Sequence, residues 1–229
     1  MAYKYIDLFC GAGGLSLGFD SAHFENIFAV EFNPDFAKTY RRNFSKHNLI
    51  VDDIRNIDNN KIKELVGVDE VDVIIGGPPC QGFSIAGNIG RTFIDDERNR
   101  LFKEFVRFVA CIQPKMFVME NVAAMATHLK GKTIKTIVEA FGNAGCGYKV
   151  KYEVLNSANY GIAQERRRIV VVGIRSDIDS EFLYPAKAEA IFTIKDVIDD
   201  LPKLESGQKS EIPNHVAMKH SAQMLEKMS

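Results

Sequence analysis

The sequence predicts an α/β fold with a mostly parallel, doubly wound sheet. Short apolar runs bounded by Gly, Pro or Asp alternate with longer stretches of helical period, which is the pattern of successive βαβ units. Several of these runs are apolar without alternation, as expected of strands that helices cover on both faces. The 229 residues are 46% hydrophobic, enough for one full core, and at roughly 150 residues per domain about half a domain remains.

The strand candidates are apolar runs rich in β-branched and aromatic residues. In chain order they cover residues 5–9, 27–32, 49–51, 71–75, 116–119, 149–155 and 169–174, the third being the weakest. Helical spacing of apolar residues predicts helices between them, at 35–44, 60–66, 98–111 and 132–141. Prolines and glycines interrupt the chain after residue 174, where only 194–201 has a clear helical pattern and 215–229 resembles a further, mostly polar helix.

Charge and hydropathy exclude several classes of protein. Lys plus Arg number 29 against 30 for Asp plus Glu, so the net charge is −1 and any contact with a polyanion must be local. No run of 18 apolar residues and no leader-like N-terminus are present, so we expect a soluble, cytoplasmic protein without a membrane partner. The four cysteines are widely spaced with no C-x-x-C pair, so neither a disulfide framework nor a structural metal is expected.

A glycine-rich loop follows the first strand candidate, where residues 7–14 read Asp-Leu-Phe-Cys-Gly-Ala-Gly-Gly. Glycines let a chain turn sharply and let backbone N–H groups approach a ligand at a helix N-terminus. Glu31 stands 20 residues after Gly11, at the end of the second strand candidate, where a carboxylate can accept both ribose hydroxyls of an adenosine ligand. Together they favour a nucleoside cofactor that need not carry phosphates. The alternative is a tight strand-to-helix turn and a solvated Glu.

The fourth strand candidate ends in Gly-Gly-Pro-Pro-Cys-Gln-Gly-Phe-Ser, residues 76–84. Prolines fix φ and remove donors, so Cys80 begins a stiff loop at the carboxyl edge of the sheet, where ligands bind in such folds. The polar and conformationally special neighbours of this cysteine favour an exposed thiolate. Cys10, Cys111 and Cys146 lack such surroundings, and we expect them to be buried, small apolar side chains.

Two further polar segments accompany the later strands. Glu120, in the Glu-Asn-Val that follows the run at 116–119, reaches the same edge and can serve as a proton donor, or else it caps the next helix. Residues 164–168 read Gln-Glu-Arg-Arg-Arg before the last strand candidate, and alternation puts Arg166 and Arg168 on one side. Two guanidiniums facing a shared cleft suit an anionic or carbonyl-rich ligand, and a solvated charge run is the alternative.

With these four motifs in this order, the chain resembles the cytosine-5 DNA methyltransferases. The motifs lie at residues 7–19, 76–84, 120–122 and 164–168, and the Pro-Pro-Cys block is the most specific of them. The resemblance implies a Rossmann-like methyltransferase fold that uses S-adenosylmethionine and releases S-adenosylhomocysteine. Residues 1–175 would form the catalytic and cofactor-binding domain.

The cofactor site implied by the resemblance draws on several segments. The glycine-rich loop would hold the cofactor, Glu31 would bind the ribose, and Phe32 would stack on adenine. Asp53 would meet the adenine edge, although Asp52 stands before it where the family commonly has Gly. The positions implied for the cofactor are Phe9, Gly11, Gly13, Gly14, Glu31, Phe32, Asp53, Ile54, Pro79 and Leu101.

The resemblance also implies covalent catalysis. Carbon 5 of cytosine is a poor nucleophile until a thiolate adds at carbon 6, and Cys80 would be that thiolate. Glu120 would protonate or hydrogen-bond ring N3, while Arg168 and Arg166 would hold the O2 carbonyl. The sulfur cannot reach carbon 6 inside a duplex, so the cytosine would be flipped out of double-stranded DNA. Contacts with DNA are expected at Gln81, Ser84 and Gln164, and the lysines of 130–151 form either a phosphate-contacting strip or a solvated face.

Members of this family continue past the arginine motif into a target-recognition region and a closing C-terminal segment. We therefore expect residues 176–229 to be an incomplete extension toward an absent recognition region, because the chain is shortened or because a second polypeptide supplies the rest. The leading hypothesis is a fragment or large subunit of a prokaryotic restriction–modification DNA methyltransferase, associated with DNA in the cytoplasm. The alternatives are a tRNA cytosine-5 methyltransferase of the same family and a non-catalytic, cofactor-binding regulatory protein.

Overall fold

The computed structural model of the chain describes residues 2–68, 70–79 and 100–228. The chain divides into two compact units, the first of residues 1–156 and 167–186 and the second of residues 157–166 and 187–229. The boundary predicted from the sequence lies at residue 175. Residues 176–186 group with the first unit, where they bond to its last two strands: Lys149 Nζ donates to the Ile178 carbonyl (3.0 Å), and the Tyr184 hydroxyl donates to the Val170 carbonyl (2.8 Å).

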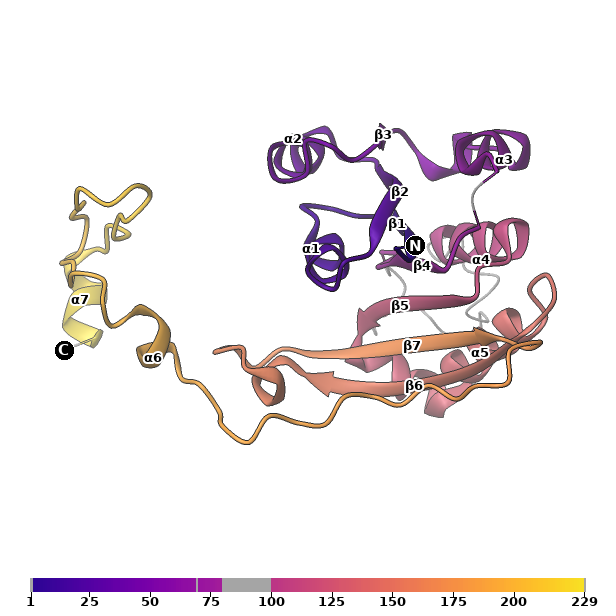
Figure 1. Ribbon diagram of the computed structural model, residues 1–229. Coiled ribbons are helices and arrows are strands. Elements are labelled where there is room, and N and C mark those ends of the chain that lie inside the picture. The colour runs from indigo at the N-terminus through magenta and orange to yellow at the C-terminus, as the bar shows by residue number, and fades with distance from the viewer. Residues whose placement is uncertain (1, 69, 80–99, 229) are drawn as a thin grey trace. The chain divides into compact units, whose positions relative to one another are not determined.

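The first unit is built on a seven-stranded sheet with the order β3-β2-β1-β4-β5-β7-β6 (Figure 1). Neighbouring strands from β3 to β5 are parallel, whereas β7 runs antiparallel to both β5 and β6. The predicted mostly parallel sheet is thus confirmed. The strands are β1 Lys4–Leu8, β2 Glu25–Glu31, β3 Leu49–Val51, β4 Val73–Gly76, β5 Met116–Val122, β6 Tyr148–Asn156 and β7 Arg167–Arg175.

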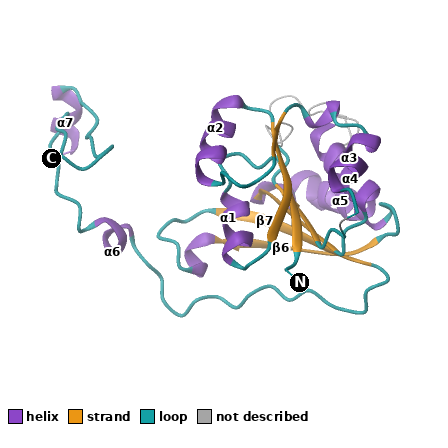
Figure 2. Cartoon of the chain, turned by 45° about the horizontal axis from the view of Figure 1, so that its top comes forward, coloured by secondary structure: helices purple, strands orange, loops and turns teal. Residues whose placement is uncertain are grey.

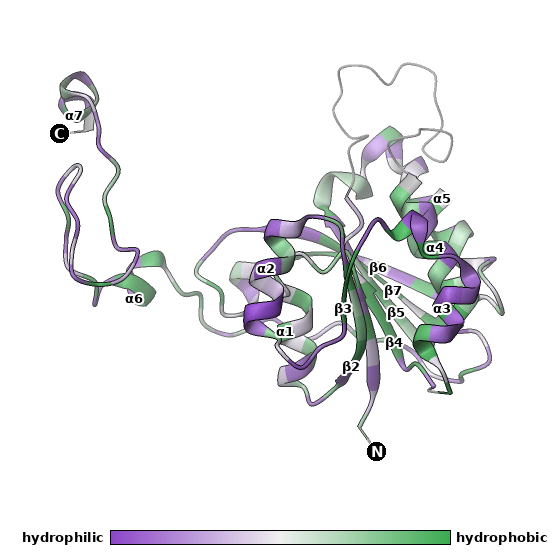
Figure 3. Ribbon diagram, turned by 90° about the horizontal axis from the view of Figure 1, so that it is seen from above, coloured by the Kyte–Doolittle hydropathy of each residue, from purple (hydrophilic) through white to green (hydrophobic). Residues whose placement is uncertain are grey.

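Helices cover both faces of this sheet, with α1 and α2 on one side and α3, α4 and α5 on the other (Figures 2 and 3). This arrangement confirms the doubly wound fold. In the second unit, the helix expected over 215–229 is shorter, because Lys209 and Val216 pair in an isolated β-bridge before it begins. The helices are α1 Gly14–Ser21, α2 Pro34–Asn43, α3 Asn59–Val66, α4 Arg100–Ile112, α5 Lys132–Gly142, α6 Ile194–Ile198 and α7 Ala222–Met228.

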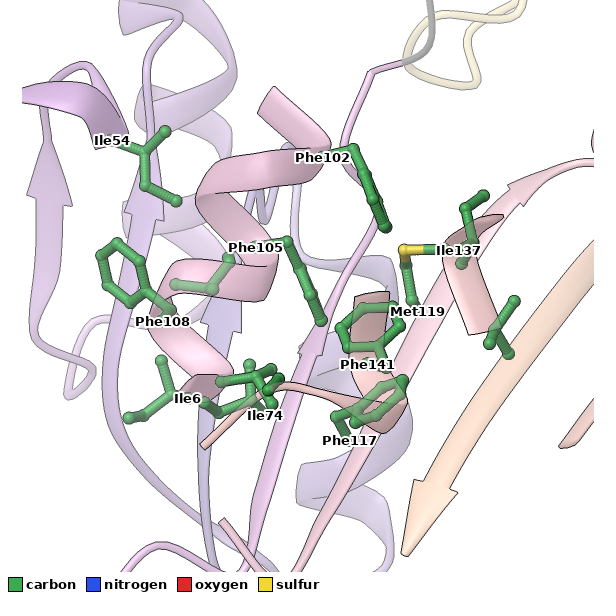
Figure 4. Close-up of a cluster of buried hydrophobic side chains, with 14 of the residues drawn as sticks. Ile6, Ile54, Ile74, Phe102, Phe105, Phe108, Phe117, Met119, Ile137 and Phe141 are labelled. Carbon is green, nitrogen blue, oxygen red and sulfur yellow. The ribbon is translucent and has the colours of Figure 1, made fainter. Parts of the chain in front are cut away.

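Alternation along the strands sorts apolar side chains to the two faces of the sheet. In β1, Ile6 joins the large core cluster with α3, α4 and α5, whereas Tyr5 packs on the other face with side chains of α1. Figure 4 shows Phe105 of α4, Phe117 of β5 and Phe141 of α5 directed into one cluster, and all three are fully buried. The rings of Phe117 and Phe141 stack with centroids 4.0 Å apart. Burying each such side chain stabilises the fold by about 1.5–3 kcal/mol.

Some boundaries differ from the sequence prediction for physical reasons. β5 continues to Val122 instead of ending at residue 119, because its antiparallel pairing with β7 extends to Arg168. β1 ends at Leu8, since Phe9 takes a positive φ of 61° that no strand accommodates. Cys146 is exposed, so its predicted burial was wrong. None of the described helices has the length and apolar character needed to cross a bilayer.

Candidate active site

A cavity of about 520 Å³ opens at the carboxyl ends of the first four strands. Small-ligand sites commonly measure roughly 300–1,000 Å³, and this edge is where parallel sheets of this kind bind ligands. The cavity brings together most of the positions predicted to hold a cofactor; Gly13 and Gly14 are not in its lining. The lining residues are Phe9, Gly11, Val30, Glu31, Phe32, Phe36, Asp52, Asp53, Ile54, Arg55, Gly77, Pro79 and Leu101.

The loop after β1 is bent by three residues with positive φ: Phe9 at 61°, Gly11 at 56° and Gly13 at 97°. A non-glycine residue in the left-handed region is uncommon, and such strained positions concentrate at ligand sites. Gly13 is needed for a second reason, because a Cβ there would lie 2.2 Å from Phe44 Cε2. The loop is therefore held against α2, and α1 begins directly after it, at Gly14.

Glu31 closes β2 and is 8% exposed. One carboxylate oxygen, Oε2, accepts the Gly11 N–H (2.8 Å), and the other, Oε1, accepts the Asn33 N–H (2.7 Å). A carboxylate offers about four acceptor positions, so each oxygen can still accept one more donor. Asn33 also caps α2, since its Oδ1 accepts the N–H groups of Asp35 and Phe36. Glu31 thus ties two edge loops together and keeps acceptor capacity for ligand hydroxyls.

The short helical turn η1 (Ile54–Asn56) forms another wall and begins after Asp53. The Asp53 carboxylate accepts the Arg55 backbone N–H (2.9 Å) and two guanidinium donors, Nε at 2.9 Å and Nη2 at 2.5 Å. This hydrogen-bonded guanidinium holds the pKa of Asp53 below its ordinary value. Ile54 is only 3% exposed, and Asp52 Oδ1 accepts the Asp53 N–H (2.6 Å). Asp52 therefore braces the turn at the position where the family commonly has Gly.

Two aromatic side chains stand at the cavity with much of their surface open to solvent. Phe32 is 70% exposed and Phe36 is 54% exposed, although both belong to residue types that fold preferentially inward. Exposed flat rings at a pocket suit stacking against a planar ligand. Pro79 and Leu101 add apolar lining from the loop after β4 and from α4.

A Glu–Arg ion pair lies at the same edge of the sheet. Arg168 Nε is 2.6 Å from Glu120 Oε1, with about a quarter to a third of each side chain exposed (26% and 31%). The loop after β4 approaches this pair closely, since a Cβ added to Gly77 would lie 3.1 Å from Glu120 Oε2. Asn121 is 6% exposed, and its Nδ2 donates to the Pro78 carbonyl (2.9 Å). The strand that carries the glutamate therefore anchors the loop that leads to residue 80.

The remaining predicted site residues fall into two groups. Cys80, Gln81 and Ser84 are outside the described residues. Gln164 and Arg166 are exposed residues of the second unit, whereas Arg168 belongs to the first unit. A cleft shared by Arg166 and Arg168 therefore stays a prediction. Within the described ranges, no three His, Cys, Asp or Glu side chains are grouped so that they could hold a metal ion.

Several lining residues were not predicted from the sequence, among them Phe36 and Arg55. Phe36 lies in the first turn of α2, five residues after Glu31. The start of a helix so close to a candidate binding carboxylate was the sequence signal that could have identified it. Arg55 comes two residues after Asp53, a spacing at which a side chain in a turn can reach back. Gly77 was predicted only as part of the motif that ends the fourth strand candidate, and its lack of a side chain also lets the loop approach Glu120.

The fold and the cavity define a Rossmann-like protein with a ligand-sized pocket at the carboxyl edge of its sheet. The chain belongs to the family of C-5 cytosine-specific DNA methylases, since the sequence model of that family matches residues 3–228. The resemblance read from the four motifs is thereby confirmed.

Similar proteins support this membership. Type II methyltransferase M1.HphI of Haemophilus parahaemolyticus is 52% identical over 229 residues, which are 100% of this chain and 61% of that protein. Type II methyltransferase M.AquIA of a Picosynechococcus species is 42% identical over 193 residues, 81% of this chain and 76% of that protein. The crystal structure of a putative DNA modification methyltransferase encoded within an Escherichia coli prophage has a TM-score of 0.76 at 28% identity, covering 91% of this chain and 59% of that one.

Proposed function

We propose that this chain is the methyl-transferring part of a type II DNA cytosine-5 methyltransferase from a bacterial restriction–modification system. The observation that carries the proposal is the closeness of two sites in a member of this family. Gly77 lines the cavity at the ends of the first four strands, and the same residue lies against the carboxylate of Glu120. A methyl-donor molecule in the cavity and a cytosine held by Glu120 and Arg168 would thus lie on either side of one loop.

The described residues fit S-adenosylmethionine. Glu31 retains acceptor positions for two ribose hydroxyls, and Asp53 retains one for an exocyclic amine. Phe32 and Ile54 offer an exposed and a buried apolar surface for the adenine ring. When bound, S-adenosylmethionine supplies an electrophilic methyl group.

The chain's own residues would activate the cytosine. Cys80, placed by its sequence motif, would add as a thiolate to carbon 6, which makes carbon 5 nucleophilic. Glu120 would hold a proton or a hydrogen bond at ring N3 as negative charge develops there. The ion pair with Arg168 fixes the direction of the Glu120 carboxyl, and loss of the carbon-5 proton would later expel the thiolate.

The basic strip expected over 130–151 is divided by its contacts. Lys149 and Lys151 bond to the chain's own segment after β7, through the Ile178 carbonyl and the Glu181 carboxylate. Lys130, Lys132 and Lys135 are exposed around the start of α5. We propose that only this second group contacts DNA phosphates.

We also propose that further protein, in the same or a second polypeptide, supplies target recognition. The chain spans 61% of the length of M1.HphI. In the second unit, α6 and the turn after it expose apolar side chains at helical spacing, which suits packing against more protein. These side chains are Ile194 (63%), Val197 (53%), Ile198 (47%) and Leu201 (37%).

A methyl-transfer assay separates this function from its alternatives. The protein in its natural full length is incubated with tritium-labelled S-adenosylmethionine and either duplex DNA or tRNA. Label in DNA is expected. Label confined to tRNA would favour the tRNA-methylating branch, whereas cofactor binding without label in either substrate would favour a regulatory protein.

A further inference from the structure

Arg55 is a charged cavity residue that neither the motifs nor the proposed chemistry uses. Its side chain lines the cavity, with 54% of the side-chain surface exposed, and reaches back over its own turn to Asp53. The Nε atom lies 2.9 Å from Asp53 Oδ1 and 3.0 Å from Oδ2, while Nη2 lies 2.5 Å from Oδ2. Such a planar fork fixes both the position and the rotation of a carboxylate.

The fork leaves Asp53 with little acceptor capacity. Its carboxylate offers about four acceptor positions, and three donors already bind it: the backbone N–H, Nε and Nη2 of Arg55. Because the Nε hydrogen is shared between Oδ1 and Oδ2, the carboxylate keeps room for about one further donor. An amine can donate to the carboxylate, whereas a carbonyl in the same place would be repelled by it.

The backbone of the same turn is held from α4. Arg107 Nη2 donates to the Ile54 carbonyl (3.1 Å), and Nη1 donates to Asn59 Oδ1 (3.0 Å). The Arg107 guanidinium is itself paired with Glu104 at 2.6 Å. With Ile54 buried and its carbonyl bonded, the turn has a fixed place. The Arg55 backbone N–H then holds Oδ1, and the Arg55 guanidinium fixes the rotation of the Asp53 carboxylate.

We propose that Arg55 is a positioning residue that makes the cavity selective for a 6-aminopurine. It acts through Asp53, leaving that carboxylate one acceptor position for the exocyclic amine and excluding purines that carry a 6-oxo group. The proposal rests on the proposed function, because it takes the cofactor to be an adenosine derivative. It adds a determinant of ligand choice to the residues implied by the family resemblance.

Calorimetric titration with two ligands tests the proposal. S-adenosylhomocysteine and its 6-oxo analogue, S-inosylhomocysteine, are titrated into the wild type, Arg55→Met and Arg55→Lys. We expect Arg55→Met to weaken S-adenosylhomocysteine binding at least tenfold and to change S-inosylhomocysteine binding less than threefold. Arg55→Lys, which keeps a charged donor but loses the planar fork, should lie between the wild type and Arg55→Met. Arg42→Met, on the exposed last turn of α2, is the matched control and should leave both affinities unchanged.

A second background tests whether Arg55 acts through Asp53. In Asp53→Asn the carboxylate is absent, so adding Arg55→Met should weaken S-adenosylhomocysteine binding by less than a further twofold. An equal loss of both ligands in Arg55→Met, or a full further loss in the Asp53→Asn background, would overturn the proposal. If the wild type binds neither ligand, the proposed function itself fails. If it binds S-adenosylhomocysteine and Arg55→Met keeps the same ligand preference, only the role of Arg55 fails.

Discussion

Asp7 is a buried carboxyl whose protonation should make the stability of the fold depend on pH. It is fully buried in β1, where Oδ2 accepts the Ser16 hydroxyl (2.6 Å) and Oδ1 has no hydrogen-bond partner among the described residues. The Ser16 hydroxyl also hydrogen-bonds to the Tyr40 hydroxyl (2.8 Å), which in turn hydrogen-bonds to His47 Nδ1 (3.0 Å). Burial, opposed by the Ser16 bond and reinforced by the charge of Glu31, raises the pKa of Asp7 from 3.8 to about 7.

The sign and size of the effect follow from this shift. Between pH 4 and pH 7 the folded state holds a proton on Asp7 that the unfolded chain has released. The associated stability is complete below about pH 4 and is lost as pH rises through about 7. For the cited pKa values, the contribution falls by about 2 kcal/mol between pH 5 and pH 7.

Urea unfolding of the wild type and Asp7→Asn across pH 5 to 8 measures this contribution. The amide mimics the protonated carboxyl, so the free energy of unfolding of the variant relative to the wild type should rise by about 2 kcal/mol from pH 5 to pH 7. Ile74→Val, a buried change without a titratable group, should cost about 0.5–1.5 kcal/mol at every pH. A constant difference between Asp7→Asn and the wild type across this range would refute the reasoning.

Three further substitutions test the site and the core. Glu31→Ala removes the acceptor for ribose and should weaken S-adenosylhomocysteine binding roughly 10–100-fold by calorimetry; an unchanged affinity would rule out the ribose role. Phe117→Ala removes a buried ring stacked on Phe141 and should lower the free energy of unfolding by about 3–5 kcal/mol, measured in urea. Asn121→Ala leaves the buried Pro78 carbonyl without its donor and should cost about 1–3 kcal/mol; a loss below 0.5 kcal/mol would contradict the anchoring role.

The sequence predicts those features of this protein that depend on neighbours along the chain. The runs that become β1 and β2 are recognisable from their apolar composition, and the glycine-rich loop is recognisable because glycines permit its turns. Glu31 could be placed at the cavity because a strand end and a spacing of 20 residues from Gly11 are local facts. The mostly parallel topology followed from the alternation of strands and helices.

The features that escaped prediction depend on contacts between distant segments. The register of β5 against β7 sets the Glu120–Arg168 ion pair, and nothing within either segment reveals that register. Phe9 was expected to extend a strand, but its left-handed backbone is imposed by the bent loop around it. An arginine side chain can adopt many solvated orientations, and the sequence does not show which one it takes. Only the folded turn brings the Arg55 guanidinium onto the Asp53 carboxylate.

Covalent trapping tests the central claim most directly. Full-length protein is mixed with S-adenosylmethionine and duplex DNA in which 5-fluorocytosine replaces the target cytosine, so that the fluorine blocks release of the enzyme. We predict a denaturant-resistant protein–DNA adduct that Cys80→Ser abolishes and that Cys111→Ser, at a partly buried cysteine of α4, leaves intact. An equal adduct yield from Cys80→Ser would contradict the account, as would its absence in a wild-type protein that methylates ordinary DNA.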